Sequence, residues 1–266
     1  MKPTGVISLF LALLLCAGFF IGCASTATTP EKASPEARAL RRLGEAYWEQ
    51  GDYSSALKYF LEAEKQAPRD HLLQYNLGLT YMEKKQYNKA IFHFKKALEL
   101  NPSYSPARNS LGNAYIYTGD YDNAVEVLNQ LIGSDAYIIY ATPQIPKANL
   151  ALAYYYKKEY ALAETNYLEA LKHYEGGFPK DKTYLSALRG LGLTYLAMDR
   201  PEEAIVQIEK AIDTAPNVQV LYLDLARAFS ATGQRSQAAE AYQMAIDLNP
   251  SSDTAAEAKS ELQFLR

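Results

Sequence analysis

Cysteine and histidine are scarce in this 266-residue sequence, which contains only two cysteines and three histidines. Cys16 and Cys23 lie near the N-terminus, and no histidine stands at a metal-ligand spacing from either of them or from another histidine. The sequence also lacks a glycine-rich phosphate loop and a nucleophile elbow. Acidic residues are scattered over predicted helix faces as solvated charges. We therefore expect no metal, no cofactor and no enzymatic activity.

Positive charge is not in excess either. The 27 lysine and arginine residues are outnumbered by 30 aspartate and glutamate residues, which gives a formal net charge of −3 at pH 7. Proteins that bind nucleic acids usually carry a basic patch or stripe, so we expect no nucleic-acid partner. The length permits one or two globular domains, although an array of repeats has no such limit, because each repeat contacts only its neighbours.

One pattern of small and large residues recurs along most of the chain. In residues 76–102 it consists of Leu77, Gly78, Tyr81, Ala90, Phe94, Ala97 and Pro102. The small residues allow two antiparallel helices to approach closely, the large residues fill the seam, and the proline ends the second helix. The leucine position is occupied in turn by Leu43, Leu77, Leu111, Leu150, Leu191 and Leu225. The first three copies follow one another every 34 residues, and an insertion precedes both the fourth and the fifth copy.

This pattern resembles the tetratricopeptide repeat, whose consensus reads L-G-x2-Y…A-x3-F…P. The resemblance implies an all-α fold, a right-handed superhelical solenoid of six repeats over residues 36–252. Residues 253–266 carry apolar side chains at helical spacing, and we expect a C-terminal capping helix that covers the last repeat. Glycine and a capping aspartate at Gly51-Asp52 and Gly119-Asp120 predict the turns inside repeats one and three. Repeats two and four lack that glycine, so their turns should be costlier.

The N-terminus indicates export. An apolar run over residues 6–20 follows Met1-Lys2 and precedes Gly22-Cys23, which predicts a lipoprotein signal peptide over residues 1–22. The Gly-Cys pair resembles the lipobox of bacterial lipoproteins, which implies lipidation of Cys23. The alternative is a single-pass anchor, because the apolar run approaches the length of a short spanning helix. Residues 23–35 are rich in Ala, Ser, Thr and Pro and are predicted to form a flexible tether. Ala24 after the cysteine points to the outer membrane, periplasmic face, in a Gram-negative source.

The family resemblance also implies a protein-binding groove on the concave face, which the first helix of each repeat lines. The inward positions hold aromatic, aliphatic and amide side chains suited to a peptide or a partner helix. They are Tyr75, Leu79, Met82, Asn109, Asn113, Ile116, Tyr117, Leu152, Tyr155 and Tyr156. No lysine or arginine accompanies them, so binding of acidic chaperone tails is disfavoured. The first insertion, residues 133–146, contains the apolar run Tyr137–Tyr140, which is a competing contact patch. The roles of this insertion and of the second insertion, residues 174–184, are open.

A lipobox, a short tether and six repeats together resemble the pilotins of type IV pili. These outer-membrane lipoproteins help the pilus secretin to insert and multimerise. The resemblance implies a monomer that is held on the membrane by its N-terminal lipid and binds a secretin subunit or another envelope protein. The alternatives are a periplasmic scaffold lipoprotein that recruits peptidoglycan hydrolases or peptidases, and a general assembly adaptor.

Overall fold

Helices form the regular structure of the computed structural model, which describes residues 34–138, 142–175 and 179–265. The first helices of the six repeats are α1 (Pro35–Glu49), α3 (His71–Glu83), α5 (Ser105–Thr118), α8 (Gln144–Tyr156), α10 (Lys182–Ala197) and α12 (Gln219–Ala231). The second helices are α2 (Tyr53–Gln66), α4 (Tyr87–Leu100), α6 (Tyr121–Ile132), α9 (Tyr160–Glu175), α11 (Pro201–Thr214) and α13 (Arg235–Leu248). The predicted signal peptide and Cys23 lie outside the described residues.

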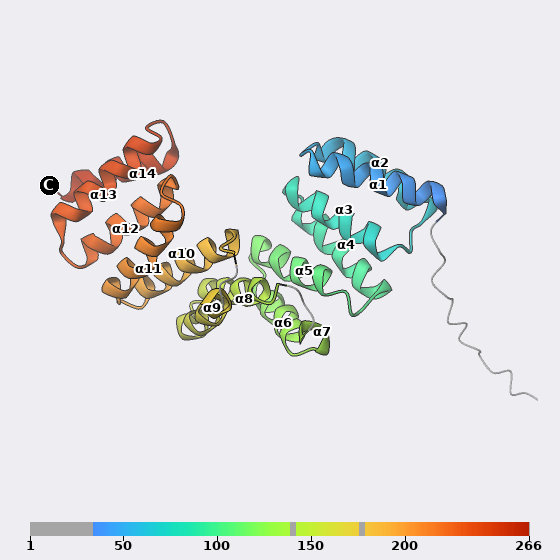
Figure 1. Ribbon diagram of the computed structural model, residues 1–266, viewed down its shortest axis with the longest axis horizontal. Helices are drawn as coiled ribbons and strands as arrows, with labels where there is room; N and C mark the ends of the chain where they lie inside the picture. Colours follow the sequence, from blue (N-terminus) through green and yellow to red (C-terminus); the bar gives the residue numbers. More distant parts are fainter. Residues whose placement is uncertain (1–33, 139–141, 176–178, 266) are drawn as a thin grey trace, which may run out of the picture. The chain divides into compact units, whose positions relative to one another are not determined.

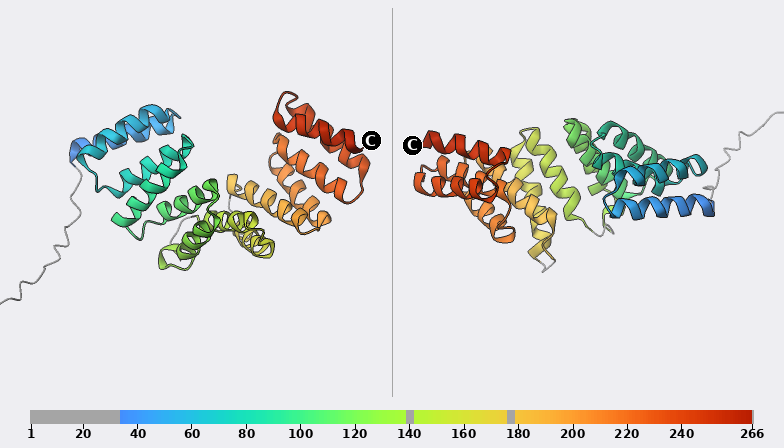
Figure 2. Two further views of the ribbon diagram at one scale, coloured as in Figure 1. Left: turned by 180° about the vertical axis from the view of Figure 1, so that it is seen from behind. Right: turned by 90° about the horizontal axis from the view of Figure 1, so that it is seen from above.

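Two further helices complete the described chain. The short α7 (Asp135–Ile138) belongs to the first insertion, and α14 (Asp253–Leu265) follows the sixth repeat and packs on α13 and α12. Each first helix packs on the second helix of its own repeat, and each second helix packs on the first helix of the next repeat (Figures 1 and 2). Successive first helices also contact one another. The predicted all-α solenoid of six repeats with a capping helix is confirmed.

Small residues at the helix crossings set the distance between the two helices of a repeat. The ring of Phe94 lies directly against Gly78, and a Cβ atom at that position would overlap it. A Cβ at Gly44 would lie 2.6 Å from the Phe60 ring, and one at Gly112 would lie 2.6 Å from Leu128 Cγ. The second-helix side chains are fully buried because they fill this space. The crossings therefore require glycine for steric reasons.

The turns inside the repeats share one backbone conformation. Gly51, Gly119 and Gly233 have φ values of 75–78°, in the left-handed region. Lys85 and Lys158 occupy the equivalent positions of repeats two and four with φ values of 55° and 63°. Side chains other than glycine rarely adopt this region, so the expectation of costlier turns in these repeats agrees with the backbone geometry.

The side-chain caps of the second helices also follow the sequence. Asp52 accepts a hydrogen bond from the Ser55 backbone N–H at 3.0 Å, and Asp120 accepts one from the Asn123 N–H at 3.4 Å. These bonds satisfy backbone donors in the first turn of α2 and α6, which have no partner inside the helix. The two predicted capping aspartates therefore act as expected.

The two insertions are only partly described. Of the proposed contact patch, Ile139 and Tyr140 lie outside the described residues, whereas Tyr137 is half-buried and donates a hydrogen bond to the Pro143 carbonyl at 3.0 Å. In the second insertion α9 continues to Glu175, and the Tyr174 hydroxyl donates to Asp181, the residue that caps α10. Within the described ranges, no helix is both long enough and apolar enough to cross a membrane.

Replacing Gly78 with alanine should destabilise the protein by about 1–3 kcal/mol, because the new methyl group must displace the Phe94 ring from a filled crossing. Gly133→Ala is the matched control. Its φ is −81°, and the nearest atom to a new Cβ is a backbone oxygen at 3.3 Å. We expect its effect to stay below about 1 kcal/mol. Denaturant unfolding followed by circular dichroism measures both, and equal stabilities for the two variants would contradict the crossing geometry.

Candidate protein-binding surface

The ten residues of the predicted groove lie on three consecutive first helices, α3, α5 and α8. Tyr117 and Tyr156 are the most exposed, at 58 % and 49 %. Ile116 is buried at 7 % exposure in the same apolar cluster as Tyr115 and Ala153. The prediction that Ile116 faces a partner is therefore wrong, because the neighbouring repeat covers it. The remaining members are half-buried.

Members of the predicted stripe line two different cavities. Five of its members, Asn113, Tyr117, Leu152, Tyr155 and Tyr156, line a cavity of about 430 Å³, which we call the central cavity. Leu79 instead lines a separate cavity of about 280 Å³ near the N-terminal repeats, which we call the N-terminal cavity. Tyr75, Met82 and Asn109 line neither of them.

Tyr75 packs against aromatic side chains of its own and the next repeat. Its ring packs edge-on against Tyr104, with centroids 5.2 Å apart, and lies 5.9 Å from the Phe94 ring. Truncating Tyr75 removes aromatic contacts between neighbouring repeats, so a Tyr75→Ala variant loses stability whether or not it contacts a partner.

One of the two asparagines of the stripe, Asn109, forms a hydrogen bond to the neighbouring repeat. Asn149 of α8 donates a hydrogen bond to the side-chain carbonyl of Asn109 of α5 at 3.0 Å, which links two repeats. Asn113, one turn further along α5, lines the central cavity together with Asn149. An amide in that position can pair with the backbone of a bound peptide.

Stacked tyrosines hold the two exposed rings in place. Tyr117 stacks on Tyr87 with centroids 4.9 Å apart and an interplanar angle of 14°. Tyr156 stacks on Tyr121 with centroids 5.2 Å apart and an interplanar angle of 12°. In each pair the first residue of one repeat's second helix supports the end of the next repeat's first helix. Both rings are thus pre-positioned, which lowers the entropic cost of binding.

The central cavity extends onto α10, beyond the predicted groove. Lys182, Ser186, Arg189, Gly190 and Leu193 contribute to its wall. Arg189 and Leu193 lie two residues before and two residues after the consensus Leu191. Tyr75 and Leu79 stand in the same relation to Leu77, and this spacing defined the groove positions in repeats two to four. Extending the same rule to repeat five would have found them. No carboxylate side chain lines this cavity. Arg189 is paired with Asp224 behind the wall, whereas Lys182 forms no ion pair among the described residues and gives the cavity an unpaired positive charge.

Tyr167 forms the floor of the central cavity from α9 and is 2 % exposed. Repeat four has Ala151 in place of the consensus glycine, and the Tyr167 ring lies instead against Gly190 of the next repeat. A Cβ atom at Gly190 would overlap this ring. Burial raises the pKa of the Tyr167 hydroxyl well above its usual range, so the hydroxyl stays neutral.

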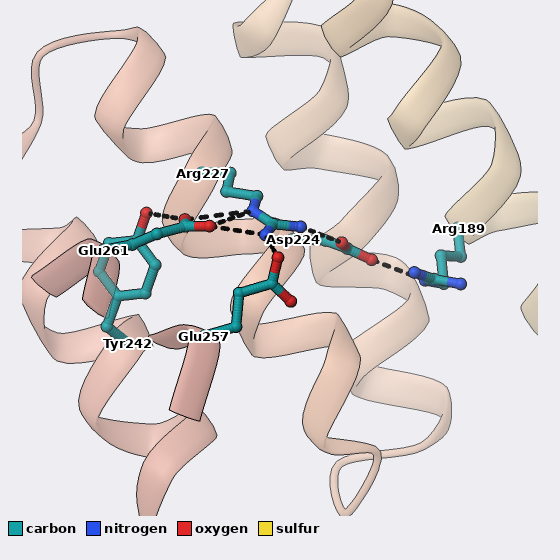
Figure 3. A network of polar contacts seen from close by, with 6 residues as sticks. All are labelled: Arg189, Asp224, Arg227, Tyr242, Glu257 and Glu261. Atoms are coloured by element: carbon teal, nitrogen blue, oxygen red, sulfur yellow. Dashed lines mark hydrogen bonds and ion pairs between the residues drawn. The ribbon is translucent and has the colours of Figure 1, made fainter. Parts of the chain in front are cut away.

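Arg189 is fixed in the cavity wall by a buried carboxylate (Figure 3). Its Nε donates to Asp224 Oδ2 at 2.6 Å, and Asp224 is 1 % exposed. Burial raises the pKa of Asp224, and the adjacent Arg189 guanidinium opposes that rise. The second oxygen of Asp224 lies 4.0 Å from Arg227 Nη1. A charge that is held by a buried partner loses little entropy when it binds a ligand.

Arg227 extends this network to the capping helix. It donates to both Glu257 and Glu261 of α14, with Nη2 2.6 Å from Glu261 Oε1. Tyr242 of α13 also donates to Glu261, at 2.8 Å. The hydrogen bond from Arg227 is the largest cause that lowers the pKa of Glu261. Partial burial opposes it by raising the pKa, and the hydrogen bond from the Tyr242 hydroxyl lowers the pKa further. The chain of contacts therefore runs from the cavity wall on α10 to the last helix (Figure 3).

Sequence comparisons agree with this architecture. Five family models, each described as tetratricopeptide repeat, match residues 37–70, 72–104, 93–126, 144–217 and 195–262. The fold defines a protein built from stacked helical hairpins, and the chain belongs to the tetratricopeptide repeat family. Proteins of this family are generally non-catalytic scaffolds for protein interaction. Among the described residues, no group of His, Cys, Asp or Glu side chains could hold a metal ion.

Several solved structures share the fold. The structure of PilW, a widely conserved type IV pilus biogenesis factor, matches with a TM-score of 0.76 at 18 % identity, over 85 % of this chain and 100 % of PilW. PilF of Pseudomonas aeruginosa matches with a TM-score of 0.68 at 17 % identity, over 85 % of this chain and 97 % of PilF. YrrB, a repeat protein with an unusual peptide-binding site, matches with a TM-score of 0.54 at 19 % identity, over 76 % of this chain and 97 % of YrrB. No curated protein matches the sequence.

Replacing Arg227 with methionine should destabilise the docking of α14 by about 1–3 kcal/mol, because Glu261 and Glu257 lose their charge-assisted partner. Arg235→Met is the matched control, since Arg235 is exposed and has no ion pair among the described residues. Hydrogen exchange of the α14 amides measures the difference. Since the folded-state pKa of Glu261 is depressed, the stabilisation is present above its ordinary value of 4.5 and is lost as the pH falls through the folded-state value. Equal exchange in both variants at pH 7 would show that the cap docks without this network.

Proposed function

We propose that this protein is an outer-membrane lipoprotein that assists assembly of the secretin in type IV pilus biogenesis. The observation that carries the proposal is the match with the whole length of PilW, a pilus biogenesis factor, at a TM-score of 0.76. The match covers 85 % of this chain and therefore extends well beyond one or two hairpins. Because the identity is 18 %, the likeness itself concerns the fold, and the N-terminal sequence supplies the independent support.

The N-terminal sequence favours attachment to a membrane through a lipid. Gly22-Cys23 follows an apolar run, and no cysteine occurs after Cys23. A lipid on Cys23 would be followed by the tether, residues 24–35, which spans roughly 20 Å as a random coil. In this arrangement the repeats lie close to the periplasmic face of the outer membrane, where a secretin subunit inserts.

The central cavity is the surface that we assign to the partner. Exposed tyrosines at its rim offer contact area at low entropic cost, and amides on α5 and α8 can pair with an extended backbone. Lys182 and Arg189 select an anionic group at the α10 end. The protein would hold a segment of the secretin subunit here and keep it from aggregating until the ring closes.

Secretin multimers measure the proposed function directly. Deleting the gene should abolish the multimeric secretin band on gels and the surface pili, and the wild-type gene should restore both. Cys23→Ser should lose the acyl mass and fail to restore assembly at the outer membrane, whereas Cys16→Ser is the matched control, because Cys16 lies inside the segment removed from the mature protein. Normal multimers in the deletion strain, with altered cell shape or hydrolase levels, would favour the scaffold for peptidoglycan hydrolases instead.

Truncating the exposed rim of the central cavity should weaken partner binding. In a Tyr117→Ala/Tyr156→Ala double variant we expect affinity to fall roughly thirtyfold, because aromatic anchors carry most of an interface's energy. The melting temperature should also fall, because each ring stacks on a tyrosine of the preceding repeat, so binding is measured at a temperature at which the double variant remains folded. Phe264→Ala, on α14 at 88 % exposure, is the control for a lost surface aromatic. Calorimetric titration with the solubilised secretin subunit measures all three proteins, and unchanged affinity in the double variant would move the site elsewhere.

A further inference from the structure

The N-terminal cavity differs in chemistry from the central cavity. It is lined by Glu45, Trp48 and Glu49 of α1, Phe60 of α2, and Asn76 and Leu79 of α3. Two carboxylates and an indole therefore surround a space of about 280 Å³, and no lysine or arginine lines it. Like the central cavity, it lies on the row of first helices.

Hydrogen bonds hold one of the two carboxylates in the cavity wall. Glu45 Oε1 accepts from Arg41 Nη1 at 3.0 Å and from Asn76 Nδ2 at 2.8 Å. Arg41 also lies 3.4 Å from Asp70, so its charge is shared between two acids. Glu49, one turn after Glu45, is exposed and forms no ion pair among the described residues. The cavity therefore has a net negative charge.

This combination of groups suits a basic side chain. Tryptophan is the best aromatic partner for a cation, and carboxylates form charge-assisted hydrogen bonds with lysine and arginine. Phe60 and Leu79 offer apolar walls against which the methylene stem of such a side chain can pack. Trp48 itself is held by an edge contact with Tyr53, with ring centroids 6.0 Å apart.

We propose that the N-terminal cavity binds a lysine or arginine side chain of the partner protein. The inference rests on the proposed function only in assuming that a protein segment lies along the first helices. Among the described residues, Glu49 gives the N-terminal cavity an unpaired negative charge and Lys182 gives the central cavity an unpaired positive charge, so the two sites distinguish the ends of such a segment. A segment binds well when its basic residue lies at repeats one and two and its acidic group lies at repeats four and five. Binding of the same segment in the reverse chain direction is disfavoured.

Selection from a library of randomised dodecapeptides tests this assignment without any secretin. The detergent-solubilised full-length protein is compared with a Glu45→Gln/Glu49→Gln variant, which keeps the shape of the cavity and one acceptor oxygen at each position but removes both negative charges. The matched control is Glu62→Gln/Glu99→Gln, which removes two exposed carboxylates from the second helices α2 and α4. We expect lysine and arginine to be enriched by the wild type and by the control, and the enrichment to be lost in the cavity variant.

A selected peptide then supplies the quantitative test. Changing its basic residue to glutamine should weaken binding to the wild type about fivefold to tenfold and leave binding to the cavity variant unchanged. Trp48 is the only tryptophan in the sequence, so its fluorescence should change when the basic peptide binds. No enriched peptides, equal enrichment by the cavity variant, or binding without a response of Trp48 would each overturn the assignment. Normal secretin multimers in a deletion strain would overturn the proposed function and leave this result intact.

Discussion

The close approach of two helices at a glycine is the constraint on which this protein depends. Where the Phe94 ring fills the space above Gly78, the pair of helices is held at one distance, and the same arrangement returns at Gly44 with Phe60 and at Gly112 with Leu128. A change in helix separation at one crossing also shifts the repeats that follow, because each repeat packs directly on the one before it. The position of every surface residue on the first helices therefore follows from a few buried contacts.

Repeat four is where this regularity changes, and the central cavity forms at that place. Tyr167 does not have a glycine of its own repeat opposite it and lies against Gly190 of repeat five. The first helix of repeat four also packs more extensively against its neighbours α5 and α10 than most other first helices do. Both insertions flank this repeat. Repeat six also has alanine, Ala226, in the glycine position, so the two insertions are what distinguish the surroundings of the central cavity from a uniform array.

The sequence predicts most of the fold and only part of the candidate site. Periodicity sufficed for the repeats, the capping helix and the aspartate caps, because each depends on neighbouring residues. It failed at Ile116, where the helix position points inward but the next repeat covers the side chain. It also missed that members of the stripe line two different cavities, because the sequence pattern does not reveal long-range contacts such as the hydrogen bond from Asn149 to Asn109. Arg189 was within reach of the pattern, but its fixation by Asp224 is a contact over 35 residues.

The contacts from Arg189 through Asp224 and Arg227 to Glu261 join the wall of the central cavity to the final helix. Asp224 is hydrogen-bonded to Arg189 and lies 4.0 Å from Arg227, so a new anion beside Arg189 alters the electrostatic field at both Asp224 and Arg227. Thermodynamic linkage is reciprocal. If a ligand in the central cavity stabilises the docking of α14, the docking of α14 strengthens the binding of that ligand by the same free energy. Through this linkage, a ligand that binds in the central cavity would change the hydrogen-exchange protection of the α14 amides, although it does not contact the C-terminal cap.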